Sequence, residues 1–143
     1  MPAVVDLGTG TTIAFGTSGF PSELLSVNWT GISREVVDTT PLSITPAAPG
    51  TIGNRRFKAA HAVDPGTLEC EFHFNPNDNP PVGEDEETIT ITFPIVTGDL
   101  TAATWSATGL MTNFEVSGIE LDSKMVARAT IKLTGAITIT DAT

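Results

Sequence analysis

Apolar and polar residues alternate with a period of two near the end of the chain, over residues 124–140. Successive side chains of a β-strand point to opposite faces, so this period predicts one long strand with an apolar face and a polar face. The alternation breaks only at Gly135-Ala136, where we expect a bend or bulge. The apolar positions are Met125, Ala127, Ala129, Ile131, Leu133, Ile137 and Ile139, and the polar ones are Arg128, Thr130, Lys132, Thr134, Thr138 and Thr140.

Two earlier segments alternate in the same way and predict two more strands. Residues 67–74 place Leu68, Cys70, Phe72 and Phe74 on the core face and Glu69, Glu71 and His73 on the outer face. Residues 87–95 place Ile89, Ile91, Phe93 and Ile95 inward and Thr88, Thr90 and Thr92 outward. Pro94 cannot donate to a strand ladder, so the second strand should end there or lie at an edge.

The other strands are marked less clearly. Residues 103–116 change parity, and we expect a bulge at Gly109. Residues 11–15 predict a short strand that ends at Gly16. Residues 24–34 predict another strand, broken at Gly31, with Leu25, Val27 and Trp29 on one side.

Between residues 38 and 66 the alternation gives way to a stretch rich in Pro and Gly. Such a long loop is uncommon in a compact domain and is usually functional or disordered. Within it, residues 52–62 fit either a strand or a helical turn. No segment keeps the spacing of a helix. The chain is therefore expected to be one all-β domain, 1–143, folded as a two-sheet antiparallel β-sandwich or a barrel, with an N-terminal arm at 1–10 and the long loop at 38–66.

Charge and composition exclude several functions. The net charge is −10, and such a surface repels nucleic acid instead of gripping it. A single cysteine, Cys70, cannot form an internal disulfide or a cysteine-based zinc site. No apolar run reaches the length of about 20 residues that spans a membrane, and the first residues do not resemble a secretory signal. We therefore expect synthesis in the cytoplasm and no membrane partner.

Candidate chemistry is sparse. His61 and His73 are the two histidines, and neither has further ligands at metal spacing. The acidic run at 84–87 could hold Ca²⁺, although a solvated hairpin tip is the better interpretation. Glu69 and Glu71 lie about 7 Å apart on one strand face, at about 3.3 Å per residue, but no substrate cleft accompanies them. We expect no enzymatic activity and no cofactor.

A resemblance to a known family is carried by residues 31–42, Gly-Ile-Ser-Arg-Glu-Val-Val-Asp-Thr-Thr-Pro-Leu, and by the order of segments after them. The segments are a strand ending at Phe72-His73-Phe74-Asn75-Pro76, then residues 89–94, a strand containing Trp105, and the strand at 124–140. Together they resemble the tail tube (major tail) proteins of long-tailed phages. The resemblance covers residues 12–139, although a helix that many relatives carry looks absent or reduced at 75–85.

The resemblance implies a structural virion protein that assembles into hexameric rings, which stack into the tail tube. DNA would pass through the lumen during ejection without specific binding. The implied partners are other copies of the chain and the tape measure, tail tip and terminator proteins. The loop at 38–66 would reach a neighbouring ring, and its candidate contact residues are Arg34, Asp38, Thr39, Arg55 and Arg56.

An acidic lumen would keep DNA from adhering, because like charges oppose phosphate contact. The lumen-facing candidates are Glu69, Glu71, His73, Thr88, Thr90 and Thr92, with Arg128 and Lys132 as neutralising partners of the two glutamates. Two alternatives stay open. One is the tube protein of a contractile or type VI secretion-like system, and the other is a ligand-binding β-sandwich module.

Overall fold

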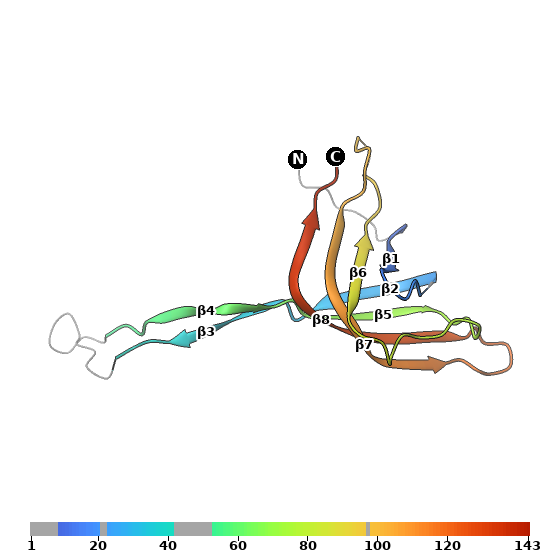
Figure 1. Cartoon of the computed structure of the whole chain (residues 1–143), viewed down its shortest axis with the longest axis horizontal. Helices are drawn as coiled ribbons and strands as arrows, with labels where there is room; N and C mark the ends of the chain where they lie inside the picture. The colour runs from blue at the N-terminus through green and yellow to red at the C-terminus, as the bar shows by residue number, and fades with distance from the viewer. Residues whose placement is uncertain (1–8, 21–22, 42–52, 97) are drawn as a thin grey trace.

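The computed structural model describes residues 9–20, 23–41, 53–96 and 98–143, and within these ranges the chain forms eight strands and no helix. Six strands make one antiparallel sheet, and β3 (Ser33–Asp38) and β4 (Phe57–Asp64) form a separate hairpin (Figure 1). The spatial order of the six strands is β1 (Thr12–Phe15), β6 (Glu87–Thr92), β7 (Thr104–Ser117), β8 (Val126–Thr140), β5 (Thr67–His73) and β2 (Glu23–Thr30).

The sheet folds over into two layers, because its two long central strands each belong to both (Figure 1). Of the whole length of β7, only residues 104–109 pair with β6. Of the whole length of β8, only residues 126–132 pair with β5. Layer I therefore consists of β1, β6 and residues 104–109 and 133–140. Layer II consists of β2, β5 and residues 110–117 and 126–132. The all-β antiparallel sandwich is confirmed, with the difference that one sheet supplies both layers.

Apolar side chains of both layers meet inside the fold. Phe20, from the turn after β1, lies among three other rings, with centroids 5.6 Å from Phe15, 5.6 Å from Phe72 and 6.2 Å from Phe114. The edge-to-face arrangement of these rings is the one their quadrupoles favour. The fully or nearly fully buried core consists of Phe15, Phe20, Leu68, Cys70, Phe72, Ile89, Ile91, Ala107, Met111, Ala127, Ala129, Ile131 and Leu133.

β8 matches its predicted pattern. Ala127, Ala129, Ile131 and Leu133 are all buried on the predicted face. The interruption expected at Gly135 is also present, since Gly135 has φ 79° and the β7–β8 register shifts opposite it. A positive φ suits glycine because it has no Cβ to clash. The bend in β8 lies where the strand passes from layer II to layer I.

The bulge in β7 was predicted at the wrong residue. The register shifts between Met111 and Asn113, so the extra residue is Thr112 and not Gly109. Gly109 stays in the regular alternation and faces inward. A Cβ there would lie 2.9 Å from both Ile131 Cγ2 and Leu133 Cδ2, so these two side chains occupy the space that a larger residue would need.

The inward face of β2 was also predicted wrongly at one position. A register shift between Leu24 and Ser26 turns Leu25 outward, where it is 40% exposed, and Leu24 packs against the core instead. Val27 and Trp29 face inward as predicted. The Trp29 indole donates a hydrogen bond to Pro65 C=O at 2.7 Å, which ties β2 to the turn before β5.

The segment at 38–66 is only partly a loop. Residues 57–64 form β4, which pairs with β3, so the ambiguous stretch at 52–62 contains a strand. We call the β3–β4 hairpin the arm, because it extends away from the six-stranded sheet (Figure 1). Residues 42–52 and the predicted N-terminal arm up to residue 8 lie outside the described residues.

Candidate assembly surfaces

Layer II has an open edge on each side. β2 ends the strand order on one side, and residues 110–117 of β7 have no strand beside them on the other, within the described part of the chain. An unpaired strand edge presents free backbone donors and acceptors and is a template for pairing with another chain. Layer I is open in the same way at β1 and at residues 133–140.

The outer face of layer II is polar and slightly hollow. Glu69 and His73 are exposed on β5 and Glu71 is half-buried, as their strand parity predicted. Arg128 of β8 lies opposite Glu71, with 3.7 Å between its Nε and the Glu71 carboxylate. A shallow hollow of about 260 Å³ lies on this face, and its polar lining is Ser26, Asn28, Glu69, Glu71, Asn113, Glu115, Arg128 and Thr130.

The six residues predicted to face a lumen fall into two groups that the structure does not bring together. Glu69, Glu71 and His73 lie on layer II. Thr88, Thr90 and Thr92 lie on β6 in layer I, where they pair with Thr108, Ser106 and Thr104 of β7. The two groups were joined because both alternate cleanly. Alternation identifies the polar face of a strand, but it does not tell which layer the strand belongs to.

Four of the five residues predicted for inter-ring contact gather on the arm, at the end of β3 and just before β4. Thr39 N–H donates to Arg56 C=O at 2.9 Å, and Arg55 forms an ion pair with Asp38 at 3.3 Å. The Thr40 side-chain and backbone hydrogen bonds lower the pKa of Asp38. Arg34 lies nearer the sheet and donates to Ala60 C=O at 2.6 Å.

One face of the arm carries exposed apolar side chains beside two charged ones, Arg34 and Asp38. Val36 pairs with Ala59 across the two strands, and Phe57 and Val63 share the parity of Ala59. Val36 is 64% exposed, Phe57 60% and Val63 55%. A two-stranded hairpin is at best marginally stable alone in water. Its apolar face therefore favours contact with another surface.

The base of the arm is held by an ion pair to the sheet. Lys132 Nζ of β8 lies 2.8 Å from Asp64 Oδ1 at the end of β4, and it also donates to Gly66 C=O at 3.3 Å. Asp64 Oδ1 accepts a second hydrogen bond from Gly66 N–H at 2.8 Å. The hydrogen bonds from Lys132 and Gly66 lower the pKa of Asp64. Lys132 was predicted to neutralise Glu69 or Glu71, and instead its ion pair is with Asp64.

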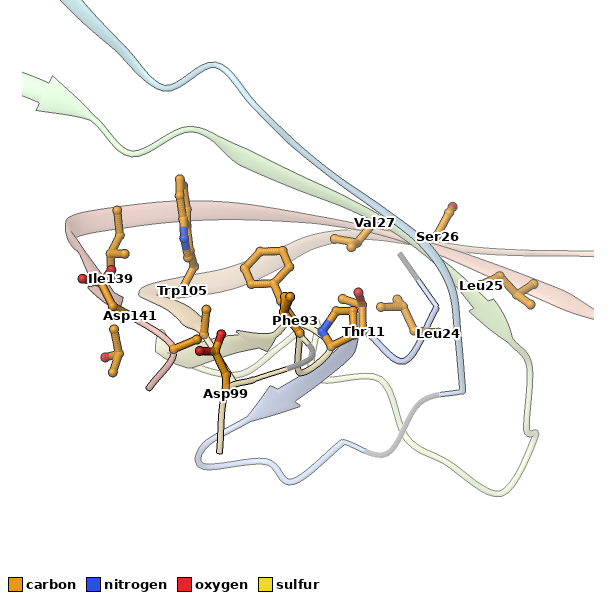
Figure 2. Close-up of a pocket in the computed structure, with 15 residues that line it drawn as sticks. Thr11, Leu24, Leu25, Ser26, Val27, Phe93, Asp99, Trp105, Ile139 and Asp141 are labelled. Atoms are coloured by element: carbon orange, nitrogen blue, oxygen red, sulfur yellow. The ribbon is translucent and has the colours of Figure 1, made fainter. Parts of the chain in front are cut away.

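An apolar groove of about 940 Å³ opens between β2 and layer I (Figure 2). Phe93 and Trp105 form part of its wall, with ring centroids 6.4 Å apart, and Val27 faces it from β2. Leu25 and Ile139 are 40% and 54% exposed on its lining, and Asp99 and Asp141 add carboxylates. Sequence reasoning missed the groove because its residues come from separate strand ends.

The four residues of the acidic run at 84–87 differ in solvent exposure. Glu84, Asp85 and Glu86 are exposed, whereas Glu87 is only 7% exposed and accepts hydrogen bonds from the turn after β1.

Within the described residues there is no cluster of three or more His, Cys, Asp or Glu side chains that could hold a metal ion. In the same part of the chain, no helix has the length and apolar character of a membrane span.

Comparison with known proteins shows the fold. No protein-family profile matches the sequence, and no curated protein matches it. Among solved structures, the chain is similar to a chain from the PVC sheath/tube terminator of an extracellular contractile injection system, determined by cryo-electron microscopy in the extended state. The TM-score is 0.71 at 12% identity, and the alignment covers 97% of this chain and 99% of that chain. The chain therefore shares its all-β fold with a chain of a contractile injection system.

Proposed function

We propose that the chain is a structural tail protein that self-assembles into hexameric rings, which stack into a phage tail tube. The observation that carries the proposal is the pair of open edges on opposite sides of layer II. A heterologous contact between two different patches closes into a ring when its rotation permits. Pairing of β2 of one copy with β7 of the next would join layer II of all copies into a continuous barrel and remove these edges.

The polar face of layer II is the proposed lumen wall. It carries Glu69, Glu71 and His73, and the Glu71 charge is partly offset by Arg128. A wall with net negative charge lets DNA pass without adhering, because phosphate is repelled. Thr88, Thr90 and Thr92 belong to layer I, so in this arrangement they face the outside of the tube.

The arm is the proposed contact between stacked rings. It extends beyond the sheet (Figure 1). Asp38, Thr39, Arg55 and Arg56 come together where β3 ends and β4 begins. The proposed partners are other copies of this chain along the tube and tape measure, tail tip and terminator proteins at its ends. The protein would be made in the host cytoplasm and reside in the virion tail.

The second candidate is a tube or terminator component of a contractile system. The similarity to a sheath/tube terminator of a contractile injection system favours it. Both candidates require self-association through strand edges and differ in whether a sheath surrounds the product. A ligand-binding module is the third candidate, and the apolar groove of about 940 Å³ is the feature that supports it.

Negative-stain microscopy of the purified chain tests the proposal. Rings or tubes are the expected result. A monodisperse monomer of 15.0 kDa at every concentration and salt would contradict self-assembly and favour the binding module. An Asn28→Lys variant sharpens the experiment, because a charge on the open β2 edge opposes strand pairing. Thr88→Lys is the matched control, since Thr88 lies on layer I between two neighbouring strands.

A further inference from the structure

Charge is divided unequally between the arm and the rest of the chain. Four of the seven Lys and Arg residues lie between positions 33 and 64, but only three of the seventeen Asp and Glu residues do. The remainder of the chain therefore carries fourteen acidic and three basic side chains. Opposite potentials attract two protein surfaces and fix their orientation. The segment 33–64 thus has a net charge of +1 and the rest of the chain −11, so the arm is the part of one copy that the acidic body of another does not repel.

The apolar face of the arm cannot be covered by its own sheet. Among the described strands, the arm contacts the six-stranded sheet only at β8, near the Asp64–Lys132 ion pair, and then extends away from it (Figure 1). Val36, Phe57 and Val63 stay more than half exposed as a result. An exposed apolar patch of this kind marks a contact surface. No described part of the same chain covers this face, which favours a covering surface from a second molecule.

The groove has the matching chemistry. Its wall is apolar, from Val27, Phe93 and Trp105, so it can receive a valine and phenylalanine ridge (Figure 2). Its lining also includes Asp99 and Asp141. On the arm, Arg56 and Lys58 stand on either side of Phe57 in the sequence, so their long side chains leave the strand on the other face and only their charged ends can reach the border of the Phe57 face. A hydrophobic centre with charged groups at its border is the usual arrangement of a specific interface.

We infer that the arm of one copy packs its Val36 and Phe57 face into the groove of a second copy, with Arg56 and Lys58 near Asp99 and Asp141. The inference rests on the proposed function, because it names the surface that receives the arm in the assembly. The occupant is thus a second copy of this chain, and not a small apolar ligand or the chain's own first residues.

Disulfide trapping between two copies tests the contact. Phe57→Cys chains are mixed with Ile139→Cys chains and oxidised under conditions that allow assembly. A disulfide needs Cα atoms about 4.4–6.8 Å apart, so only a close contact is captured. The expected product is a crosslinked dimer of about twice 15.0 kDa on a non-reducing gel. Cys70 is buried, so the native thiol contributes no background.

The matched control is Leu121→Cys mixed with Ile139→Cys. Leu121 is 91% exposed on the loop between β7 and β8, so its thiol is at least as accessible as one at position 57. Equal crosslinking from position 121 would overturn the inference. A second result would also overturn it: an internal disulfide in a Val4→Cys/Ile139→Cys chain that prevents the arm of another copy from binding. The chain's own first residues would then fill the groove.

Failure of this inference can be told from failure of the proposed function. If microscopy shows tubes while position 57 never crosslinks to position 139, the groove is not the acceptor and the tube function stands. If the crosslink forms but no ring or tube is seen, the contact is established and the tube function fails. A Phe57→Ser variant adds a second readout: we expect loss of tubes with an unchanged melting temperature, whereas Leu121→Ser should retain both.

Discussion

The Ser18 hydroxyl donates a hydrogen bond of 2.7 Å to the Glu87 carboxylate, which joins the turn after β1 to the start of β6. The same carboxylate accepts bonds from Ser18 N–H at 2.6 Å and Thr17 N–H at 3.1 Å. A buried carboxylate is costly unless its hydrogen bonds are made, and here three donors satisfy it. The turn that it holds carries Phe20 into the core.

Glu87→Ala should therefore destabilise the fold. Removing the acceptor leaves the Ser18 and Thr17 donors without their partner, and we expect a loss of about 2–3 kcal/mol in the free energy of unfolding. Urea denaturation measures the loss. Glu86→Ala is the matched control, because Glu86 is the exposed neighbour. Equal effects of the two variants would contradict the role given to Glu87.

Gly109→Ala should also destabilise the core. The new Cβ would lie 2.9 Å from side-chain atoms of Ile131 and Leu133, which are 0% and 2% exposed and have little room to move. Overpacking of this kind costs about 1–3 kcal/mol. Thermal unfolding should show a lower midpoint for Gly109→Ala and little change for Gly83→Ala, since nothing lies within 4 Å of a Cβ at Gly83. An unchanged midpoint for Gly109→Ala would mean that the core relaxes.

The Asp64–Lys132 ion pair should respond to acid. The pKa of Asp64 is lowered from its ordinary value of 3.8, so the pair is intact above that pH and is lost as pH falls through the lowered folded-state value. A carboxyl NMR titration should give a midpoint below 3.8 in the native chain. Lys132→Met should move the midpoint back upward, while Arg128→Met leaves it in place. A midpoint unaffected by Lys132→Met would show that Gly66 alone lowers it.

Cys70 should be unreactive in the folded chain. Burial raises the pKa of its thiol to about 12, and the thiolate is the nucleophile, so almost none is present at pH 8. A colorimetric thiol reagent should label Cys70 only after denaturation. Rapid labelling of the native protein would mean that β5 opens readily.

The lumen assignment predicts how a charge change alters DNA retention. In tubes of Glu69→Lys, each ring would carry six new positive charges on the lumen wall, and we expect DNA to be retained with an affinity that falls as salt rises. Co-sedimentation with duplex DNA measures this retention. Glu84→Lys makes the same charge change on the exposed loop before β6. If the Glu84 variant binds DNA as strongly and the Glu69 variant does not, the lumen lies elsewhere.

The sequence predicted strands wherever burial on one side forces apolar and polar residues to alternate. β5, β6 and β8 were placed well for that reason. β4 could not be told from a helical turn, because the arm has no core of its own and nearly all of its side chains are exposed. A strand without a buried face leaves no period of two to detect.

Bulges explain the remaining errors. Leu24 and Leu25 are both apolar, so composition cannot tell which of them faces the core, and the register shift in β2 decides it. Likewise, the parity change in β7 was seen, but its position at Thr112 depends on how β7 pairs with β8. The role of Glu87 and the groove both depend on contacts between distant segments, which one sequence does not show.

β7 and β8 each cross from one layer to the other as a single strand, bent in β8 at Gly135, and this has a mechanical consequence. A force that pulls the two layers apart acts along the covalent backbones of β7 and β8. To separate these strands, it would have to shear many of the hydrogen bonds between them at the same time. Each subunit should therefore behave as a stiff element. A tube under axial stress would deform at the contacts between rings and keep its subunits intact.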